Sequence, residues 1–140
     1  MSTERGHRTV PHTADVIIEA WAPDLVGCFE EAVAALVSIY ARCDDAAPLA
    51  ERRVQLSPGP AESQLLDLLD EVIFALDTAD GIPVVATVDK RDDGGLDVVL
   101  RLAPSDRVEA VGAVPKAISH AELEVRQMAD RVSCRFLVDV

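Results

Sequence analysis

The chain has 140 residues, 49% of them apolar, which is enough for one domain with a single hydrophobic core. Its formal net charge is −12, and this excludes a surface built mainly to bind nucleic acid, because such surfaces neutralise phosphates with Lys and Arg. An acidic surface favours solubility, a basic protein partner or a cation. No apolar run is long enough to cross a membrane.

The first ten residues, MSTERGHRTV, are mostly polar and contain no apolar core. We therefore predict no signal peptide and a flexible N-terminus over residues 1–10. The three cysteines, Cys28, Cys43 and Cys134, are widely spaced and fit neither a disulfide framework nor a CxxC metal pattern. Reduced thiols of this kind are typical of cytoplasmic proteins, so we expect one cytoplasmic domain over residues 1–140.

The first half of the chain shows a strand pattern followed by two helix patterns. From Ala14 to Trp21, side chains alternate between two faces as in a strand. Asp24 then stands at the N-cap position of a helix predicted over 25–41. After a short predicted strand over 53–56, apolar residues at helical spacing predict a second amphipathic helix over 61–79.

The second half of the chain contains two hairpin patterns. In the first, the cluster RDDGG separates two apolar runs, and its Asp93-Gly94 pair can take positive φ. The second hairpin turns across QMADR. The predicted strands of the two hairpins cover residues 82–90, 96–102, 121–126 and 132–138.

The segment over 103–119 has weak periodicity, and connections of this length are often functional or mobile. Two helices and about six strands predict an α+β fold. We expect a single domain with a mixed, mostly antiparallel sheet and both helices packed on one face of it.

The sequence contains no Ser-His-Asp order, no Gly-rich phosphate loop and no HExxH motif, so we expect no enzyme. A few titratable residues nevertheless stand at the ends of predicted elements. These candidates are His12, Asp15, Lys116, His120 and Asp139.

Asp15 opens the first predicted strand and Asp139 closes the last one. If these strands pair antiparallel, the two carboxylates become neighbours, and the terminal carboxylate of Val140 lies in the same corner. Three carboxylates repel one another unless a cation or a proton lies between them. Oxygen ligands favour Mg²⁺, Ca²⁺ or Mn²⁺ over Zn²⁺.

Each candidate also has a purely structural interpretation. Asp15 can be a turn or capping residue, and Asp139 can be a solvated charge at a strand end. His12 can orient a neighbouring ligand or lie exposed in a loop. Lys116 and His120, which follow the long connection, can contact a partner or simply be solvated.

Several stretches resemble signature segments of the archease family. PHTADVIIEAWAPDLVGCFEEAVAALVSIY resembles the family's N-terminal HTADVG motif and the amphipathic helix after it. ESQLLDLLDEVIFALDTAD is similar to the second helix, VPKAISHAELEV to a K-A-x-T-Y-H-x-L stretch, and the terminal VDV to the usual ending. The resemblance covers nearly the whole chain in the right order.

This resemblance implies a small partner protein of the GTP-dependent RNA-splicing ligase, which guanylylates its own histidine and joins RNA ends. Archeases speed the guanylylation and allow multiple turnovers. The family's metal site is formed by the HTADVG aspartate, an aspartate near the C-terminus and the terminal residue, which correspond here to Asp15, Asp139 and Val140. Lys116 matches the lysine of the K-A-x-T motif.

The chain departs from the family pattern at two places. Ile17 stands where the family has the glycine of HTADVG, and a side chain there removes the freedom to take positive φ. The family's Tyr-His pair is His120-Ala121 here, so the histidine is displaced by one position, which in a strand moves it to the other face.

We therefore predict a non-enzymatic activator of an RNA ligase in tRNA splicing or RNA repair, with a carboxylate site for Ca²⁺, Mg²⁺ or Mn²⁺. RNA is expected to be contacted only indirectly. The alternatives are a metal-dependent phosphohydrolase that uses the same carboxylates and a metal-free, chaperone-like binding module. The sequence predicts neither the identity of the ion nor the oligomeric state.

Overall fold

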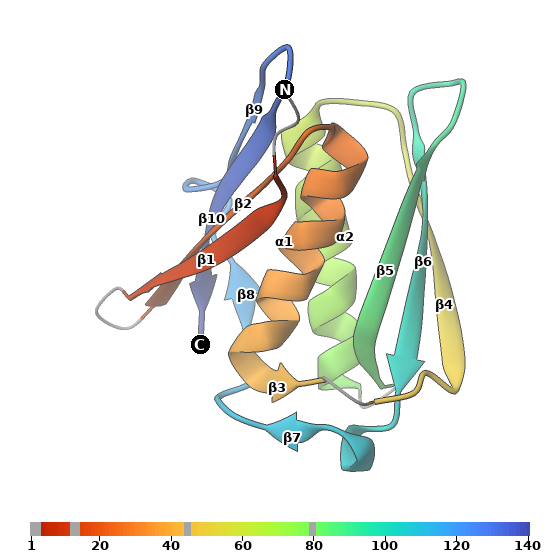
Figure 1. Ribbon diagram of the computed structural model, residues 1–140, viewed down its shortest axis with the longest axis vertical. Coiled ribbons are helices and arrows are strands. Elements are labelled where there is room, and N and C mark those ends of the chain that lie inside the picture. Colours follow the sequence, from red (N-terminus) through yellow and green to blue (C-terminus); the bar gives the residue numbers. More distant parts are fainter. Residues whose placement is uncertain (1–3, 12–14, 44–45, 79–80) are drawn as a thin grey trace.

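The computed structural model describes residues 4–11, 15–43, 46–78 and 81–140. Within these residues the chain forms two α-helices, a short 3-10 helix and ten strands (Figure 1). In chain order they are β1 (Gly6–Pro11), β2 (Asp15–Ala22), α1 (Leu25–Tyr40), β3 (Ala41–Arg42), β4 (Ala50–Leu56), α2 (Ala61–Asp77), β5 (Ile82–Lys90), β6 (Leu96–Ala103), η1 (Ser105–Arg107), β7 (Glu109–Ala110), β8 (Ala117–Ile118), β9 (Glu124–Gln127) and β10 (Val132–Asp139).

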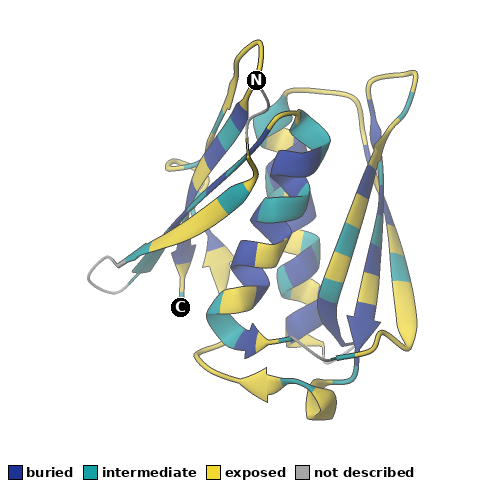
Figure 2. Ribbon diagram, viewed as in Figure 1, coloured by how far each residue is buried: buried dark blue, intermediate teal, exposed yellow. Residues whose placement is uncertain are grey.

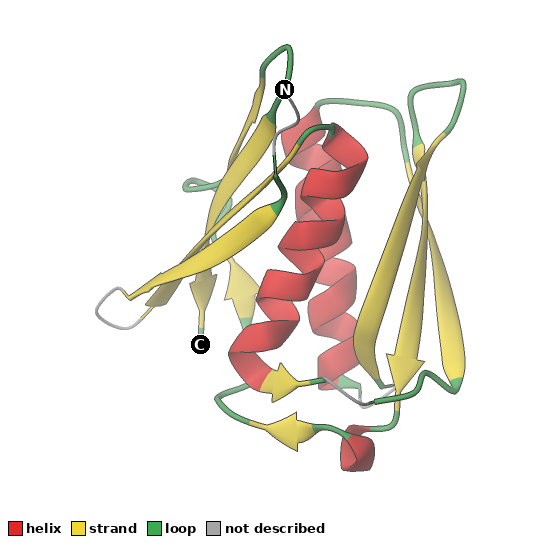
Figure 3. Ribbon diagram, in the orientation of Figure 1, coloured by secondary structure: helices red, strands yellow, loops and turns green. Residues whose placement is uncertain are grey.

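The two helices lie side by side between two antiparallel sheets (Figure 3). The first sheet has the order β1-β2-β10-β8, and β9 also pairs with β10. The second has the order β4-β6-β5, while β3 and β7 form a separate short pair. The predicted α+β class is confirmed. The strands outnumber the six that were predicted and are divided among sheets, so each large sheet has the helices on one of its faces.

Both predicted helices are confirmed to within two residues at each end. The N-terminus of α1 is capped by Asp24, whose carboxylate accepts a 2.8 Å hydrogen bond from the backbone N–H of Gly27. α2 starts directly after Pro60 and has no side-chain cap. Pro60 is the N-cap residue, and Glu62 places a negative charge in the first turn, where it interacts favourably with the helix dipole.

The hydrophobic core fills the space between the sheets and the helices, where the buried faces meet (Figure 2). Phe29 of α1 and Phe136 of β10 are both fully buried in it. In β10 burial alternates strictly, so every second residue faces the helices and the others face away. The buried set is Val132, Cys134, Phe136 and Val138, and the outward set is Ser133, Arg135, Leu137 and Asp139.

The N-terminus differs from the prediction of a flexible segment over 1–10. Residues 6–11 form the edge strand β1, which pairs with β2 from Gly6 opposite Trp21 to Pro11 opposite Val16. A Cβ atom at position 6 would lie 2.6 Å from the indole ring, so only glycine lets Trp21 lie against this strand. The strand β1 contains one strongly apolar residue, Val10, and among the described strands it pairs only with β2. Its backbone pairing with β2 therefore holds it in the sheet.

The hairpin predicted at RDDGG is confirmed, and its Gly94 takes φ +91°. The long connection after β6 contains η1, β7 and β8, and β8 adds to the edge of β10. The last hairpin is also confirmed, although β9 begins three residues later than predicted. Within the described ranges, neither helix is long and apolar enough to span a membrane.

Candidate functional site

The antiparallel pairing on which the carboxylate corner depended is present in the structure, between β2 and β10. β2 and β10 are antiparallel, and their register places Asp139 directly opposite Asp15, next to the pair Val138–Val16. Directly opposite side chains on such strands have Cβ atoms about 4.5–5.5 Å apart. The two carboxylates are therefore neighbours. They lie at the end of β10 that Figure 1 marks with C.

The aspartate pair lies on the face of the first sheet that points away from the helices. Val16 and Val138 face the core, so by alternation Asp15 and Asp139 face outward. Asp15 is half-buried and Asp139 is exposed. A partner molecule or an ion can therefore reach both carboxylates without any change in the core.

No positive group of the described chain neutralises this pair. Among the described residues, neither Asp15 nor Asp139 forms an ion pair or a side-chain hydrogen bond. A glutamate on the same face shows the contrast, since Glu19 lies 3.1 Å from the Arg8 guanidinium and 3.6 Å from that of Arg135. Two uncompensated carboxylates opposite each other repel, and a bound cation would remove this repulsion.

The segment before β8 lies beside the pair. The backbone N–H of Lys116 donates a 2.8 Å hydrogen bond to the carbonyl of Asp139, and Ala117 stands opposite Asp139 in the register. The Lys116 side chain is exposed and forms no ion pair with any residue that the structure describes. Val140 is half-buried and packs against the core, so the chain end is held next to Asp139.

The two histidine candidates have different outcomes. His12 lies outside the described residues. His120 is exposed in the loop between β8 and β9 and lies near Asp70 of α2. Partial burial raises the pKa of Asp70, and the charge of His120 partly offsets this effect. Its neighbourhood is thus the surface of α2, so the structure does not bring His120 to the aspartate pair.

The donor set of the pair fits a hard divalent cation. Within the described ranges, no group of three His, Cys, Asp or Glu side chains comes together. The available side-chain ligands are the carboxylates of Asp15 and Asp139. Oxygen donors of this kind suit Ca²⁺, Mg²⁺ or Mn²⁺, and the open position of the pair leaves room for water or a partner's groups.

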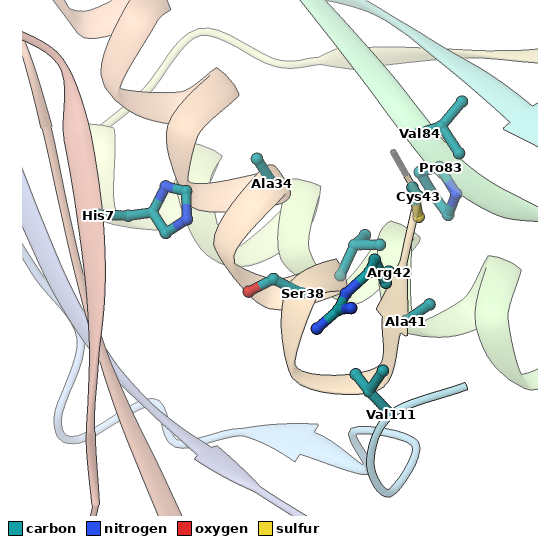
Figure 4. A pocket seen from close by; sticks show the side chains of 10 residues that line it. His7, Ala34, Ser38, Ala41, Arg42, Cys43, Pro83, Val84 and Val111 are labelled. Carbon is teal, nitrogen blue, oxygen red and sulfur yellow. The ribbon is translucent and has the colours of Figure 1, made fainter. Parts of the chain in front are cut away.

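A separate hollow of about 430 Å³ lies on the other side of the first sheet, near the C-terminal half of α1 (Figure 4). His7, Ser38, Arg42 and Cys43 bring polar atoms to it. The Nδ1 atom of His7 lies 2.9 Å from a carboxylate oxygen of Glu31. None of the residues predicted from the sequence as site candidates lines this hollow.

The sequence analysis missed the charged side chains that share the outward face with the aspartate pair. Glu19 of β2 stands opposite Arg135 of β10, and Trp21 stands opposite Ser133. The alternation along β10 places Arg135 on the same face as Asp139, and this pattern could have identified Arg135 from the sequence. Arg126 and Arg131 come close to Arg135 only through the β9–β10 hairpin, which no local pattern shows.

The sequence was also compared with known protein families. The Archease protein family matches residues 7–140 of this chain, which is nearly its whole length. The chain belongs to the archease family. "Probable protein archease" of Mycobacterium tuberculosis is 40% identical over 139 residues, a match that covers 99% of this chain and 76% of the relative. "Protein archease" of Pyrobaculum islandicum is 28% identical over 139 residues, covering 96% of this chain and 95% of that protein.

Two solved structures share the archease fold with this chain. The solution structure of Methanobacterium thermoautotrophicum protein 1598 is 23% identical, with a TM-score of 0.74, and the match covers 96% of this chain and 99% of that chain. The crystal structure of an archease from Thermotoga maritima, described as a possible chaperone, is 19% identical, with a TM-score of 0.68, covering 95% of this chain and 96% of that chain. These likenesses confirm the α+β fold.

Proposed function

We propose that this chain is a non-enzymatic activator of a GTP-dependent RNA-splicing ligase in the cytoplasm. It would promote guanylylation of the ligase's histidine and allow multiple turnovers in tRNA splicing or RNA repair. Membership of the archease family supports this role. The observation that carries the proposal is the pair formed by Asp15 and Asp139, two opposed carboxylates without a compensating cation among the described residues.

The pair would act as a divalent-ion site at the surface where the ligase docks. Asp15, Asp139 and the terminal carboxylate of Val140 would hold the ion, and a bound Ca²⁺, Mg²⁺ or Mn²⁺ supplies positive charge for phosphate oxygens or for carboxylates of the partner. Lys116, exposed beside Asp139, would contact a phosphate or an acidic group of the partner. His120 lies at the surface of α2, so it would meet the partner only at a second point, away from the ion.

Catalysis would remain with the ligase. The sequence offers no nucleophile next to a general base, so the chain is not expected to form a covalent intermediate of its own. With a net charge of −12, it would also bind RNA only through the ligase. The role of the chain would be to favour the ligase conformation that accepts guanylate.

The test is ligation with a trace of ligase and an excess of RNA carrying a 5′-hydroxyl end and a phosphorylated 3′ end. We expect the wild-type chain to increase the number of ligations per ligase molecule. Asp139→Asn should remove most of this increase, because it removes one ligand and one charge. Asp89→Asn is the matched control, since Asp89 is an exposed β5 aspartate that also faces an aspartate across its sheet.

The same assay separates the two alternative functions. Unchanged turnover with added wild-type chain would refute the activator role. Phosphatase or nuclease activity of the chain alone would instead support a metal-dependent phosphohydrolase. Activation that survives Asp15→Asn, Asp139→Asn and removal of divalent ions would support a metal-free binding module, in line with the description of the T. maritima relative as a possible chaperone.

A further inference from the structure

A second polar site lies on the outward face of the first sheet, away from the aspartate pair. It is a hollow of about 300 Å³ between β2, β10 and the β9–β10 turn. Three arginines, Arg126, Arg131 and Arg135, line it together with Trp21 and Ser133. The lining residues nearest to the aspartate pair are Glu19 and Arg135, each four residues along its strand from Asp15 or Asp139, a separation of about 13 Å at the usual rise per residue. The hollow is therefore distinct from the proposed ion site.

The composition of this hollow differs from that of the whole chain. The chain has 25 acidic and 13 basic residues, yet arginines outnumber acidic residues here by three to two. The two acidic residues are Glu19 and Glu124, and no lysine is among the lining residues. Arginine presents a planar fork of N–H donors that matches phosphate and carboxylate oxygens, whereas lysine acts as a point charge.

Each guanidinium contacts one neighbouring side chain, but none of these contacts is a short hydrogen bond to a carboxylate. Arg131 lies over the ring of Trp21, with its Cζ atom 5.5 Å from the ring centroid. Arg135 lies 3.6 Å from Glu19, and Arg126 lies 3.6 Å from Glu124. These contacts keep the three guanidinium groups near the hollow, although the exposed ion pairs hold them only weakly.

The donors of the three arginines are largely unused. A hydrogen bond from a guanidinium to an oxygen is normally about 2.7–3.2 Å long, and within the described part of the chain none of the three guanidinium groups makes one. Glu19 makes its closer contacts with Arg8, at 3.1 and 3.2 Å. Arg135 is therefore only a second, longer partner of that glutamate, and it can turn to another oxyanion.

We propose that this hollow binds a phosphate monoester. A terminal phosphate has three oxygens in a tetrahedral arrangement and carries close to two negative charges, so it can accept hydrogen bonds from guanidinium groups on several sides. A carboxylate has two oxygens in one plane and one charge, which one or two arginines satisfy. Ser133 adds a hydroxyl to the lining of the hollow. This inference does not depend on the ligase proposal.

The test uses Trp21, the only tryptophan of the chain, as a fluorescent reporter inside the hollow. The protein is titrated separately with inorganic phosphate, with a nucleoside monophosphate and with the corresponding nucleoside, which has no phosphate. We expect saturable quenching or a spectral shift with the two phosphate ligands, because a ligand that draws Arg131 away changes the environment of the indole. The nucleoside should bind at least tenfold more weakly than its monophosphate.

Variants then assign the signal to the arginines. Arg135→Gln should weaken binding of the nucleoside monophosphate at least tenfold while leaving the contact between Arg131 and Trp21 in place. Arg101→Gln is the control, because Arg101 is a similarly exposed arginine on β6 with a 3.8 Å contact to Glu51. Calorimetric titration of both variants excludes optical artefacts, and circular dichroism confirms that they fold.

Three results would overturn the assignment. The first is no saturable response to any phosphate ligand in low-salt buffer. The second is equal weakening by Arg101→Gln and Arg135→Gln, which would indicate unspecific charge attraction. The third is binding of a glutamate-rich peptide as tight as that of the nucleoside monophosphate, which would identify the hollow as a contact for an acidic protein segment.

Discussion

The two large sheets each contain a pair of aspartates that face each other across antiparallel strands. Asp15 and Asp139 form the pair of the first sheet, and Asp89 and Asp97 form that of the second. Both pairs lie on the side of the sheet that faces away from the helices. In the second pair, Arg91 donates a 3.1 Å hydrogen bond to Asp97. In the first pair no described residue does the same.

The two pairs differ in whether an arginine of the described chain compensates their charge. Carboxylates directly opposite each other destabilise a sheet. The second sheet offsets this effect with an arginine from its own hairpin, and hydrogen bonds to Asp93 and Asp97 raise the pKa of Arg91. In the first sheet no described residue offsets the repulsion, and a bound divalent ion would do so. For a cation site, two opposed aspartates without an arginine partner are therefore a stronger indication than two opposed aspartates that an arginine already neutralises.

The largest expected effect concerns the framework that holds the first pair. Phe136 is fully buried in β10, three residues before Asp139. Phe136→Ala should lower the free energy of unfolding by about 3–5 kcal/mol and the melting temperature by roughly 10–20 °C. Leu137→Ala, the neighbouring outward-facing position, should cost less than half as much. Equal losses in thermal melts would contradict the assignment of the two faces.

The two aspartate pairs should respond to neutralisation with opposite signs. In buffer without divalent ions, Asp15→Asn should raise the free energy of unfolding by about 0.2–1 kcal/mol, because it removes a like-charge contact. Asp97→Asn should lower it, because Arg91 loses an acceptor. Urea denaturation of both variants measures the two changes. A loss of stability in Asp15→Asn would mean that a group of the protein already compensates the first pair.

The smallest effect concerns pH and the hairpin that holds Arg91. The N–H of Gly95, followed by Arg91, lowers the pKa of Asp93 below its ordinary value of 3.8. A carboxyl with a depressed pKa in the folded state stabilises the protein above the unfolded pKa, and this contribution is lost as the pH falls through the folded pKa. Asp93→Asn should therefore be less stable than wild type near neutral pH. The difference should vanish in strong acid, and a difference that persists there would contradict this origin.

Much of the framework follows from sequence patterns. The apolar spacing of the two helices, Asp24 as an N-cap and the RDDGG turn each depend on local physical chemistry, and each was predicted to within a few residues. The proximity of Asp15 and Asp139 followed from the sequence only on the condition that the first and last strand patterns pair antiparallel, since the start of one strand then meets the end of the other. The structure meets that condition.

Other features depend on contacts that no local pattern contains. The strand over Gly6–Pro11 has little alternation of its own and exists because β2 offers a free edge. The division of the strands into two sheets was missed because a strand shows the same alternation whichever sheet it joins. The position of His120 near Asp70 depends on a loop conformation, and the arginine hollow depends on a turn that folds Arg131 over Trp21.

The most direct test of the central claim is a calorimetric titration of the ion-free protein with Ca²⁺, Mg²⁺ and Mn²⁺. We predict that one ion binds per chain, that Asp139→Asn abolishes binding, and that Asp89→Asn leaves it unchanged. At an ion concentration a hundred times Kd, binding should stabilise the wild-type fold by about 2.7 kcal/mol. If the wild-type chain binds none of the three ions, or if Asp89→Asn loses binding as completely as Asp139→Asn, the aspartate pair is not a metal site.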